Sequence, residues 1–348
     1  MITLSNLPHR PVVGRAQARA GLLGNPSDGY GGKAVAIAIP NFSASVSIEP
    51  AECFALRAGP TDGFSFETVR EASETWRAGQ CEDGLRLLRA AVAQFARRCP
   101  VLDSLSPEDP RLRFEMQYAT DIPRQVGLAG SSAIVVAALR ALSQWFQVSV
   151  SPFSLSEWAL AAEVDELGLA AGPMDRVIQS FGGLMCMDLR EPRSPAAYVS
   201  LDRKLLPELF LAWDSAGSAS SGRVHGDLRA RWRAKEPAVM AAMQAFRDRV
   251  DQGVEALRLG DRMLFHRLMD KNFDARCALV DVSARDQEMV ALARSLGASA
   301  KLCGSGGAIV GMPQDASDFP EREVRFCDAG YRFLRPDWAS IHSEDSGS

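Results

Sequence analysis

The stretch from Gly127 to Phe146 places the strongest constraint on the fold. It reads GLAGSSAIVVAALRALSQWF, so glycines and serines stand directly before a run that is apolar on nearly every face. A helix that is apolar all round is normally buried, and the N–H groups at a helix N-terminus attract phosphate. The pattern alone favours neither of two interpretations: a phosphate-binding loop, or a buried helix entered by a tight glycine turn.

Two further glycine-serine stretches lie towards the ends of the chain, GLLGNPSDGYGG from Gly21 and KLCGSGGA from Lys301. The sequence contains no G-x-x-x-x-G-K-[ST] phosphate loop. GYGGKA nominally matches a dinucleotide-binding pattern, but it leads into a predicted strand and not into a helix, so we do not predict a dinucleotide site. Three such loops in one chain favour a shared role over three independent turns.

Strand-like and helix-like segments alternate along the chain, which predicts an α/β or α+β protein. Alternating and β-branched residues predict strands at 33–39, 43–50, 112–120 and 209–215. Helical spacing is found at 83–99, at 131–146, from Ser154, and over most of the chain from Gly222. Ser154 and Glu157 match a capping box, and 298–312 reads as a strand, a glycine loop and another apolar run.

Composition narrows the class of protein. A chain of 348 residues exceeds what one hydrophobic core usually spans, so two domains are expected. A net charge of -4 gives no electrostatic reason to expect nucleic acid or an anionic membrane as partner. Seven scattered cysteines without a C-x-x-C pair, no signal-peptide core and no membrane-length apolar segment predict a cytoplasmic protein. The oligomeric state is not predicted.

The three loops, in this order, resemble those of the GHMP kinases, the family of galactokinase, homoserine kinase, mevalonate kinase and phosphomevalonate kinase. That family has an N-terminal acceptor loop, a central P-x-x-x-G-L-G-S-S-A phosphate loop and a C-terminal glycine-rich loop. This chain reads GLAGSSA, with one additional residue between the proline and the serines. The forms ARAGLLGNPSD, GLAGSSAIV, AGPMDRV and ASAKLCGSGGA are most similar to the plant glucuronokinase branch. The resemblance covers most of the chain.

The resemblance implies an α+β fold of two α/β domains. The first, at 18–200, would be like the second domain of ribosomal protein S5 and would bind ATP. The second, at 201–338, would be ferredoxin-like. The pattern break at REPRSP supports a boundary near residue 200. Residues 1–17 are expected to form a flexible arm and residues 339–348 a disordered tail.

The activity implied by the resemblance is an ATP-dependent and Mg²⁺-dependent phosphorylation of a sugar acid, D-glucuronate, at its anomeric hydroxyl. Two alternatives stay open. One is a GHMP kinase for another acceptor, such as a different sugar, a heptose phosphate or mevalonate. The other is a non-catalytic sensor of a sugar or nucleotide, which is disfavoured because Arg19, Ser132, Glu163 and Asp175 are all present.

The ATP phosphates are assigned by the resemblance to the central and C-terminal loops. The implied ATP-binding residues are Gly127, Leu128, Ala129, Gly130, Ser131, Ser132, Gly304, Ser305, Gly306 and Gly307. Ser132 and Glu163 are implied ligands of Mg²⁺, which takes few protein ligands and keeps several waters. On the pattern alone, Glu163 also reads as a solvated helix residue.

Asp175 and Arg19 are the implied catalytic residues. Asp175 would remove or orient the proton of the acceptor hydroxyl, although an aspartate here also fits the N-cap of the next helix. Arg19 would neutralise charge on the γ-phosphate, and its alternative is a surface arginine in a basic arm. Asp28 is implied to bind sugar hydroxyls, in a loop where the family usually has Glu-His and this chain has Asn25-Pro26.

A uronate carboxylate calls for an arginine, which binds carboxylates through two parallel hydrogen bonds. The candidates are Arg124, Arg223, Arg229, Arg231 and Arg233. Arg223 is the predicted substrate-binding residue, because SGRVH reads as a glycine-serine loop and not as a helix. His225 beside it reads more readily as a solvated loop residue.

Overall fold

The structure, a computed structural model, describes residues 10–57, 63–66, 85–215 and 222–338, with the side chains of 63–66 and 222–226 outside the description. The predicted tail at 339–348 lies outside the described residues. The chain divides into two compact units built from interleaved segments. Unit 1 comprises 1–17, 42–121 and 131–171, and unit 2 comprises 18–41, 122–130 and 172–348. The contiguous domain division at residue 200 stays a prediction.

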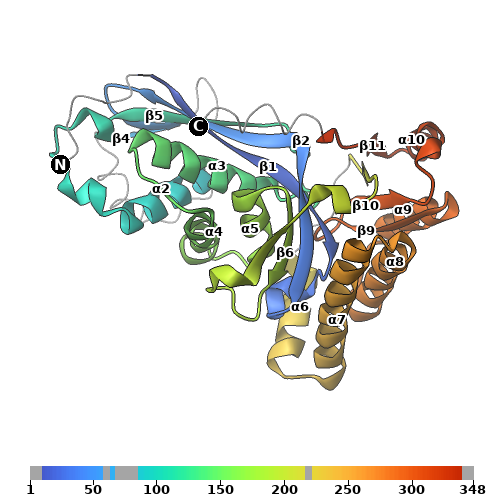
Figure 1. Cartoon of the computed structure of the whole chain (residues 1–348). Helices are drawn as coiled ribbons and strands as arrows, with labels where there is room; N and C mark the ends of the chain where they lie inside the picture. Colours follow the sequence, from blue (N-terminus) through green and yellow to red (C-terminus); the bar gives the residue numbers. More distant parts are fainter. Residues whose placement is uncertain (1–9, 58–62, 67–84, 216–221, 339–348) are drawn as a thin grey trace. The chain divides into compact units, whose positions relative to one another are not determined.

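Unit 1 combines one part of a mixed sheet with three helices. Its strands are β3 (Phe54–Arg57), β4 (Gly63–Phe66), β5 (Phe114–Thr120), the start of β1 (Val12–Leu23) and the second half of β2 (Lys33–Pro50). They follow the order β4-β3-β5-β2, in which only β3 and β5 pair in parallel. The helices are α2 (Arg86–Arg98), α3 (Gly130–Trp145) and α4 (Pro152–Ala161), which lie together beside β5 (Figure 1).

An aromatic cluster holds the helices of unit 1 against its strands. The Phe114 ring of β5 packs edge-on against Phe54 of β3 at 4.9 Å and against Phe146 at 6.0 Å between ring centroids. Phe146 in turn stacks on Phe95 of α2 at 5.6 Å. Burying each of these rings contributes roughly 1.5–3 kcal/mol. The prediction of a buried helix from Ser131 is confirmed by α3, whose residues 132–139 are all buried.

Unit 2 contains the other part of the mixed sheet. The first half of β2 pairs with β6 (Leu184–Asp188), and β6 pairs with β7 (Tyr198–Leu201), all antiparallel. Helix α5 (Met174–Phe181) packs on these strands through a core of alanines, methionines and branched residues. The short 3-10 turn η1 (Ser27–Tyr30) connects β1 to β2. Among these elements, η1 carries Asp28 and α5 carries Asp175.

A second, fully antiparallel sheet completes unit 2. Its order is β11 (Arg332–Leu334), β8 (Phe210–Trp213), β10 (Ala308–Pro313) and β9 (Ala298–Leu302). Its helices are α8 (Arg262–Leu279), α9 (Ala284–Ser295) and α10 (Phe319–Asp328), and Phe210 stacks on Phe333 at 5.0 Å in the core. Helices α6 (Gly222–Arg233) and α7 (Pro237–Leu259) pack around Tyr30 (Figure 1).

Three predicted elements differ from the structure. The expected strands at 33–39 and 43–50 are one continuous strand, β2. This strand pairs with β6 up to Ile37 and with β5 from Ala44, and Pro40 lies between these two pairings. The expected arm at 1–17 is wrong for its last residues, since β1 begins at Val12. The capping box at Ser154 is wrong as well. Helix α4 begins two residues earlier, at a proline that pre-sets the helical φ, and the Ser151 hydroxyl caps it.

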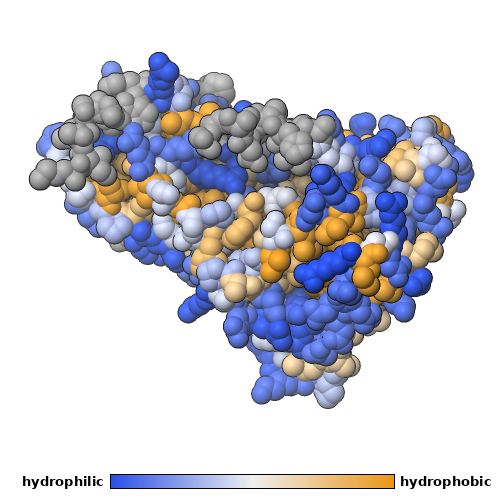
Figure 2. All heavy atoms as spheres, viewed as in Figure 1, coloured by the Kyte–Doolittle hydropathy of each residue, from blue (hydrophilic) through white to orange (hydrophobic). Residues whose placement is uncertain are grey.

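Among the described residues, every helix is too short or too polar to cross a membrane. Figure 2 shows hydrophilic side chains interspersed with smaller hydrophobic areas on the face in view. The exposed large apolar side chains are Val13, Val164, Val199, Met240, Leu259, Met263 and Val324. Met240 and Leu259 come from α7, and the other five come from five different elements.

Candidate active site

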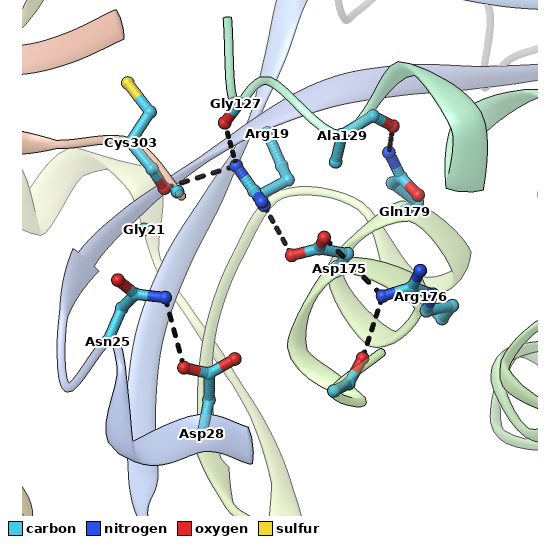
Figure 3. A network of polar contacts seen from close by, with 12 residues as sticks. Arg19, Gly21, Asn25, Asp28, Gly127, Ala129, Asp175, Arg176, Gln179 and Cys303 are labelled. Atoms are coloured by element: carbon cyan, nitrogen blue, oxygen red, sulfur yellow. Dashed lines mark hydrogen bonds and ion pairs between the residues drawn. The ribbon is translucent and has the colours of Figure 1, made fainter. Parts of the chain in front are cut away.

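Arg19, in β1, is the hub of a polar network within unit 2 (Figure 3). Its Nε donates to Oδ1 of Asp175 at 2.6 Å. Its Nη1 donates to the carbonyl oxygens of Gly127 at 2.6 Å and Cys303 at 3.2 Å. One guanidinium group therefore joins β1 to the central loop, to α5 and to the end of β9. The alternative of a surface arginine is wrong, because only 4% of Arg19 is exposed.

The ion pair with Asp175 fixes the charge of Arg19. Burial by itself lowers the pKa of this arginine, but the charge of Asp175 and the hydrogen bond to it outweigh that effect, so the pKa of Arg19 is raised. Arg19 is buried, and an oriented cation acts strongly on a bound anion where water is excluded. Arg19 can therefore serve as a fixed positive charge beside a phosphoryl group.

Asp175 lies in the first turn of α5, with its carboxylate held between two arginines. The N-cap position of this helix belongs to Pro173, and no side chain caps the helix there, so the N-cap alternative for Asp175 is wrong. The Oδ2 atom of Asp175 is 3.5 Å from Nη1 of Arg176, and a fifth of its side chain stays exposed. Burial, together with the charge of Arg19, lowers the pKa of Arg176 to about 9. The carboxylate is oriented but open to a substrate.

Asp28 lies on η1, on the same side of the network as the start of α5. Its Oδ1 accepts a hydrogen bond from Nδ2 of Asn25 at 3.1 Å. A Cβ atom added at Gly172 would lie 3.3 Å from the other oxygen, Oδ2. Burial raises the pKa of Asp28, the charge of Asp175 adds to this, and Arg19 and then Arg276 act in the opposite direction. The structure thus brings the predicted residues Asp28, Asp175 and Arg19 together.

The central and C-terminal glycine loops pack backbone against backbone within unit 2. Gly127 has a φ of +72°, and a Cβ there would approach the Gly306 carbonyl oxygen to 2.6 Å. A Cβ at Gly304 would lie 2.6 Å from the Gly127 oxygen and 2.7 Å from Nη2 of Arg19. Only glycine fits these positions. By contrast, a Cβ at Gly130 would make only an ordinary contact with Ile122 at 3.4 Å.

The remaining contacts of the loops are made by their own backbone. Leu128 accepts from the backbone N–H of Arg19 at 3.3 Å, and Ala129, at a φ of +63°, accepts from Nε2 of Gln179 at 2.8 Å. At the C-terminal loop, the N–H of Gly307 donates to Oδ1 of Asp286 at 2.8 Å. Both loops are held rigidly by their carbonyls and by side chains behind them, which suits a loop that presents backbone N–H groups to phosphate.

The chain passes from unit 2 into unit 1 between Gly130 and Ser131, at the start of α3. Ser131 is exposed, whereas Ser132 is buried in the first turn of the helix. Glu163 is also fully buried, in a single π-helical turn (Ala162–Glu166) that follows α4, so the solvated alternative for it is wrong. A hydroxyl and a buried carboxylate are oxygen donors of the kind Mg²⁺ prefers. These residues fit the predicted ion by their chemistry.

The described residues contain no metal site built from several clustered side chains. In the described ranges, no group of three or more His, Cys, Asp or Glu side chains is placed to hold a metal ion. Mg²⁺ held by one carboxylate and one hydroxyl, with waters completing its shell, does not require such a group.

The loop assignment of Arg223 is wrong, because α6 begins at Gly222 and Arg223 is in its first turn. The side chains of Arg223 and His225 lie outside the described residues. Arg231 donates hydrogen bonds to the Glu236 carboxylate and to the Leu279 carbonyl. Arg229 is half-buried on α6, and its charge opposes the rise that burial gives the pKa of Tyr30, at the end of the Asp28 turn.

Sequence reasoning missed three buried residues behind the network, namely Asn25, Arg276 and Lys301. Arg276 lies on α8 and donates to Asn25 and to the C-terminal loop. Lys301 donates from Nζ to the Gly21 and Leu302 carbonyls, both at 2.6 Å. The only signal was at Asn25, where the chain departs from the Glu-His usual in the family. An arginine in an amphipathic helix and a lysine in a strand carry no signal of their own.

Comparisons with known proteins agree with this geometry. The family model described as GHMP kinases N terminal domain matches residues 86–183, and the model described as GHMP kinases C terminal matches residues 254–331. Glucuronokinase 1 of Arabidopsis thaliana is 36% identical over 310 residues, which are 85% of this chain and 83% of that protein. The chain belongs to the GHMP kinase family. It is therefore a phosphotransferase of a family that uses ATP as co-substrate.

Other comparisons support the same family and fold. Probable glucuronokinase 2 of Arabidopsis thaliana is 35% identical over 307 residues, covering 85% of this chain and 82% of that protein. The solved structure of Lactococcus lactis galactokinase complexed with galactose matches with a TM-score of 0.77 at 12% identity, over 94% of this chain and 93% of that one. The predicted two-domain α/β fold of this kinase is confirmed.

Proposed function

We propose that this kinase transfers the γ-phosphoryl group of ATP to the anomeric hydroxyl of D-glucuronate. The observation that carries the choice of acceptor is the 36% identity to glucuronokinase 1 over 85% of this chain. The two glucuronokinases match over most of their length, whereas the galactokinase of Thermotoga petrophila is 26% identical over only 48% of this chain. The coarser conclusion, a sugar kinase, rests on the same relatives.

The geometry of the network supports a phosphoryl transfer by positioning and charge. Asp175, partly exposed and paired with Arg19, is placed to accept a proton or a hydrogen bond from an acceptor hydroxyl. Arg19 supplies a fixed positive charge for the transferred group, whose charge is spread over its outer oxygens in the transition state. Asp28 would accept hydrogen bonds from the ring hydroxyls of the sugar.

The nucleotide phosphates would be held by the two glycine loops, with Ser131 and Ser132 at the start of α3. Ser132 and Glu163 would hold Mg²⁺, which in phosphoryl transfer neutralises charge on the β- and γ-oxygens. The tight packing of Gly127 against Gly306 supports the assignment, because it gives the loops a fixed shape before any ligand binds.

The carboxylate of the sugar acid requires a cation beyond Arg19. Arg223 stays a proposal from sequence. Arg229 is a second candidate, because it is half-buried and its charge acts on Tyr30, two residues from Asp28. An arginine beside the acceptor turn would distinguish a uronate from the corresponding neutral sugar through a pair of charge-assisted hydrogen bonds.

Coupled ADP release with Mg-ATP tests the proposal. The panel comprises D-glucuronate, D-galacturonate, D-glucose, D-galactose, L-arabinose, mevalonate and homoserine. Turnover with glucuronate well above the neutral sugars supports the uronate kinase. Turnover with another member of the panel keeps the kinase and replaces the acceptor. The alternative of a non-catalytic sensor predicts ATP binding without turnover on any acceptor.

A further inference from the structure

Arg276 is a buried arginine that joins two parts of the candidate site in unit 2. It lies on α8 and is 2% exposed. Its Nη1 donates to Oδ1 of Asn25 and, at 2.9 Å, to the carbonyl oxygen of Gly304. Its Nη2 donates to the Ser305 carbonyl oxygen at 2.9 Å. One side chain therefore holds the acceptor turn and the C-terminal glycine loop at the same time.

Asn25 passes this contact on to Asp28. Its Oδ1 accepts from Arg276, and its Nδ2 donates to Oδ1 of Asp28 at 3.1 Å. The Asn25 amide accepts on one side and donates on the other, whereas an ionised carboxylate at this position has no donor and would repel Asp28. Asn272 fixes the backbone beside it, donating to the Asn25 carbonyl at 2.9 Å and accepting from the Gly24 N–H at 2.8 Å. The amide is held on every side.

We propose that Arg276 is a positioning residue for acceptor binding: through Asn25 it orients the Asp28 carboxylate, and through Gly304 and Ser305 it keeps the nucleotide loop in register with it. The inference rests on the proposed role of Asp28 in binding the sugar. It also gives a physical reason for Asn25, where the family usually has glutamate. Replacing Arg276 should therefore weaken acceptor binding more than an equally destabilising substitution elsewhere in the fold.

The chain offers a matched control in Arg322 of α10. This arginine is equally buried at 2% exposure and also donates to backbone carbonyls, those of Asp315 at 3.0 Å and Leu296 at 2.8 Å. Its partners belong to the ends of α9 and β10 and not to the acceptor turn. Replacing it removes a buried arginine with similar hydrogen bonds, so it reports what structural damage alone does to the kinetics.

The test compares Arg276→Lys, Arg276→Met and Arg322→Met in the full chain, each with its melting temperature. We expect Arg276→Met to raise the acceptor KM by about tenfold or more, as for the loss of a hydrogen bond to a charged group, with a smaller rise in the KM for ATP. Arg276→Lys should recover part of the loss. Arg322→Met should lower the melting temperature and leave both KM values near wild type. Equal effects of the two methionine variants on the acceptor KM would overturn the proposal.

A pH profile adds a readout that a structural role would not move. Several charged or titratable groups face Asp28, and they are Arg19, Tyr30, Asp175, Arg176, Arg276 and Lys301. Arg276 favours the ionised form of Asp28, so Arg276→Met should shift the acid limb of kcat/KM for the acceptor to higher pH. An unshifted limb in Arg276→Met argues against the proposal.

A double-mutant cycle tests the route through Asn25. Asn25→Ala removes the donor to Asp28, so Arg276→Met should cost much less in acceptor kcat/KM in the Asn25→Ala background than in wild type. Full additivity would contradict the relay. The cycle is run with whichever acceptor of the panel wild type turns over. Failure of glucuronate as acceptor therefore counts against the proposed function alone, and additivity with a working acceptor counts against Arg276 alone.

Discussion

The Nε atom of Arg19 lies 2.6 Å from Oδ1 of Asp175, which ties β1 to the first turn of α5 across 156 positions of the chain. This pair joins the two implied catalytic residues directly. Because Arg19 also holds the Gly127 and Cys303 carbonyls, the carboxylate is oriented relative to both glycine loops. The first prediction concerns the chemical role of this pair.

Asp175→Asn should keep ATP binding and reduce turnover about 100-fold or more, the range expected for loss of a positioned general base. The amide keeps the shape of the carboxylate but neither its charge nor its basicity. Steady-state kinetics and a nucleotide-binding titration measure the two effects separately. Asp188→Asn is the matched control, since Asp188 is also paired with an arginine, Arg190, but on β6. Near wild-type turnover in Asp175→Asn would remove Asp175 from the mechanism.

Two glycines of the central loop should differ in their tolerance of alanine. Gly127→Ala should lower the free energy of unfolding by about 1–3 kcal/mol, because the backbone there has a positive φ and a Cβ would clash with the Gly306 carbonyl oxygen. Gly130→Ala should melt near the wild-type temperature, because its Cβ meets only Ile122 at an ordinary distance. Thermal unfolding of both variants decides this. The reverse order of stability would show that the loops do not pack as described.

Glu163→Gln should raise the Mg²⁺ concentration needed for half-maximal turnover at fixed ATP, by about tenfold or more, since an uncharged amide is a poorer ligand for a hard cation. Asp165→Asn is the control, because Asp165 is an exposed carboxylate of the same π-helical turn. The added thermal stability that Mg-ATP gives over ATP alone should also shrink in Glu163→Gln. An unchanged Mg²⁺ requirement would exclude Glu163 as a ligand.

Lys301 should make stability depend on pH. Burial lowers the pKa of Lys301 in the folded protein to about 7 from an ordinary value of 10.5. The unfolded chain therefore binds more protons than the folded one between these values, and this contribution to stability rises as the pH increases from about 7. Relative to Lys301→Met, wild type should gain stability from pH 7 to pH values of about 9, measured by urea denaturation.

The control for this prediction is Lys204→Met, because Lys204 is an exposed lysine in the same unit. The stability of Lys204→Met should change with pH in parallel with that of wild type. Parallel curves for wild type and Lys301→Met would show that Lys301 does not titrate in this window.

The parts of the fold that follow from local signals were predictable. The glycines before α3, the apolar run inside it and the alternation around Gly304 are each contained in about twenty residues, and the structure confirms the elements they predict. The start of α6 was not, since Ser-Gly before Arg223 was interpreted as a loop, whereas the helix begins at Gly222. The continuity of β2 through Pro40 depends on which strands it pairs with, and no local pattern contains that information.

Asp175 and Arg19 could be proposed from the sequence because they stand beside motifs, whereas the residues that contact them from behind could not. Arg276 and Asn25 are 251 positions apart, and although Asn25 departs from the family pattern, nothing in either segment points to the other. Their interaction exists only after α8 packs behind the acceptor turn. Such supporting contacts become visible in three dimensions because burial forces each buried charge to find partners, wherever in the chain they are.

The hydrogen bond from Arg19 to the Cys303 carbonyl has a consequence for folding during protein synthesis. These partners are 284 positions apart, so Arg19 has left the ribosome long before its last acceptor is synthesised. The network closes only when the chain has been extended through Cys303. A nascent or prematurely terminated chain carries the phosphate loop and Asp175 without the residue that completes their arrangement. The arrangement of Arg19 between the central and C-terminal glycine loops therefore forms only after Cys303 has been synthesised.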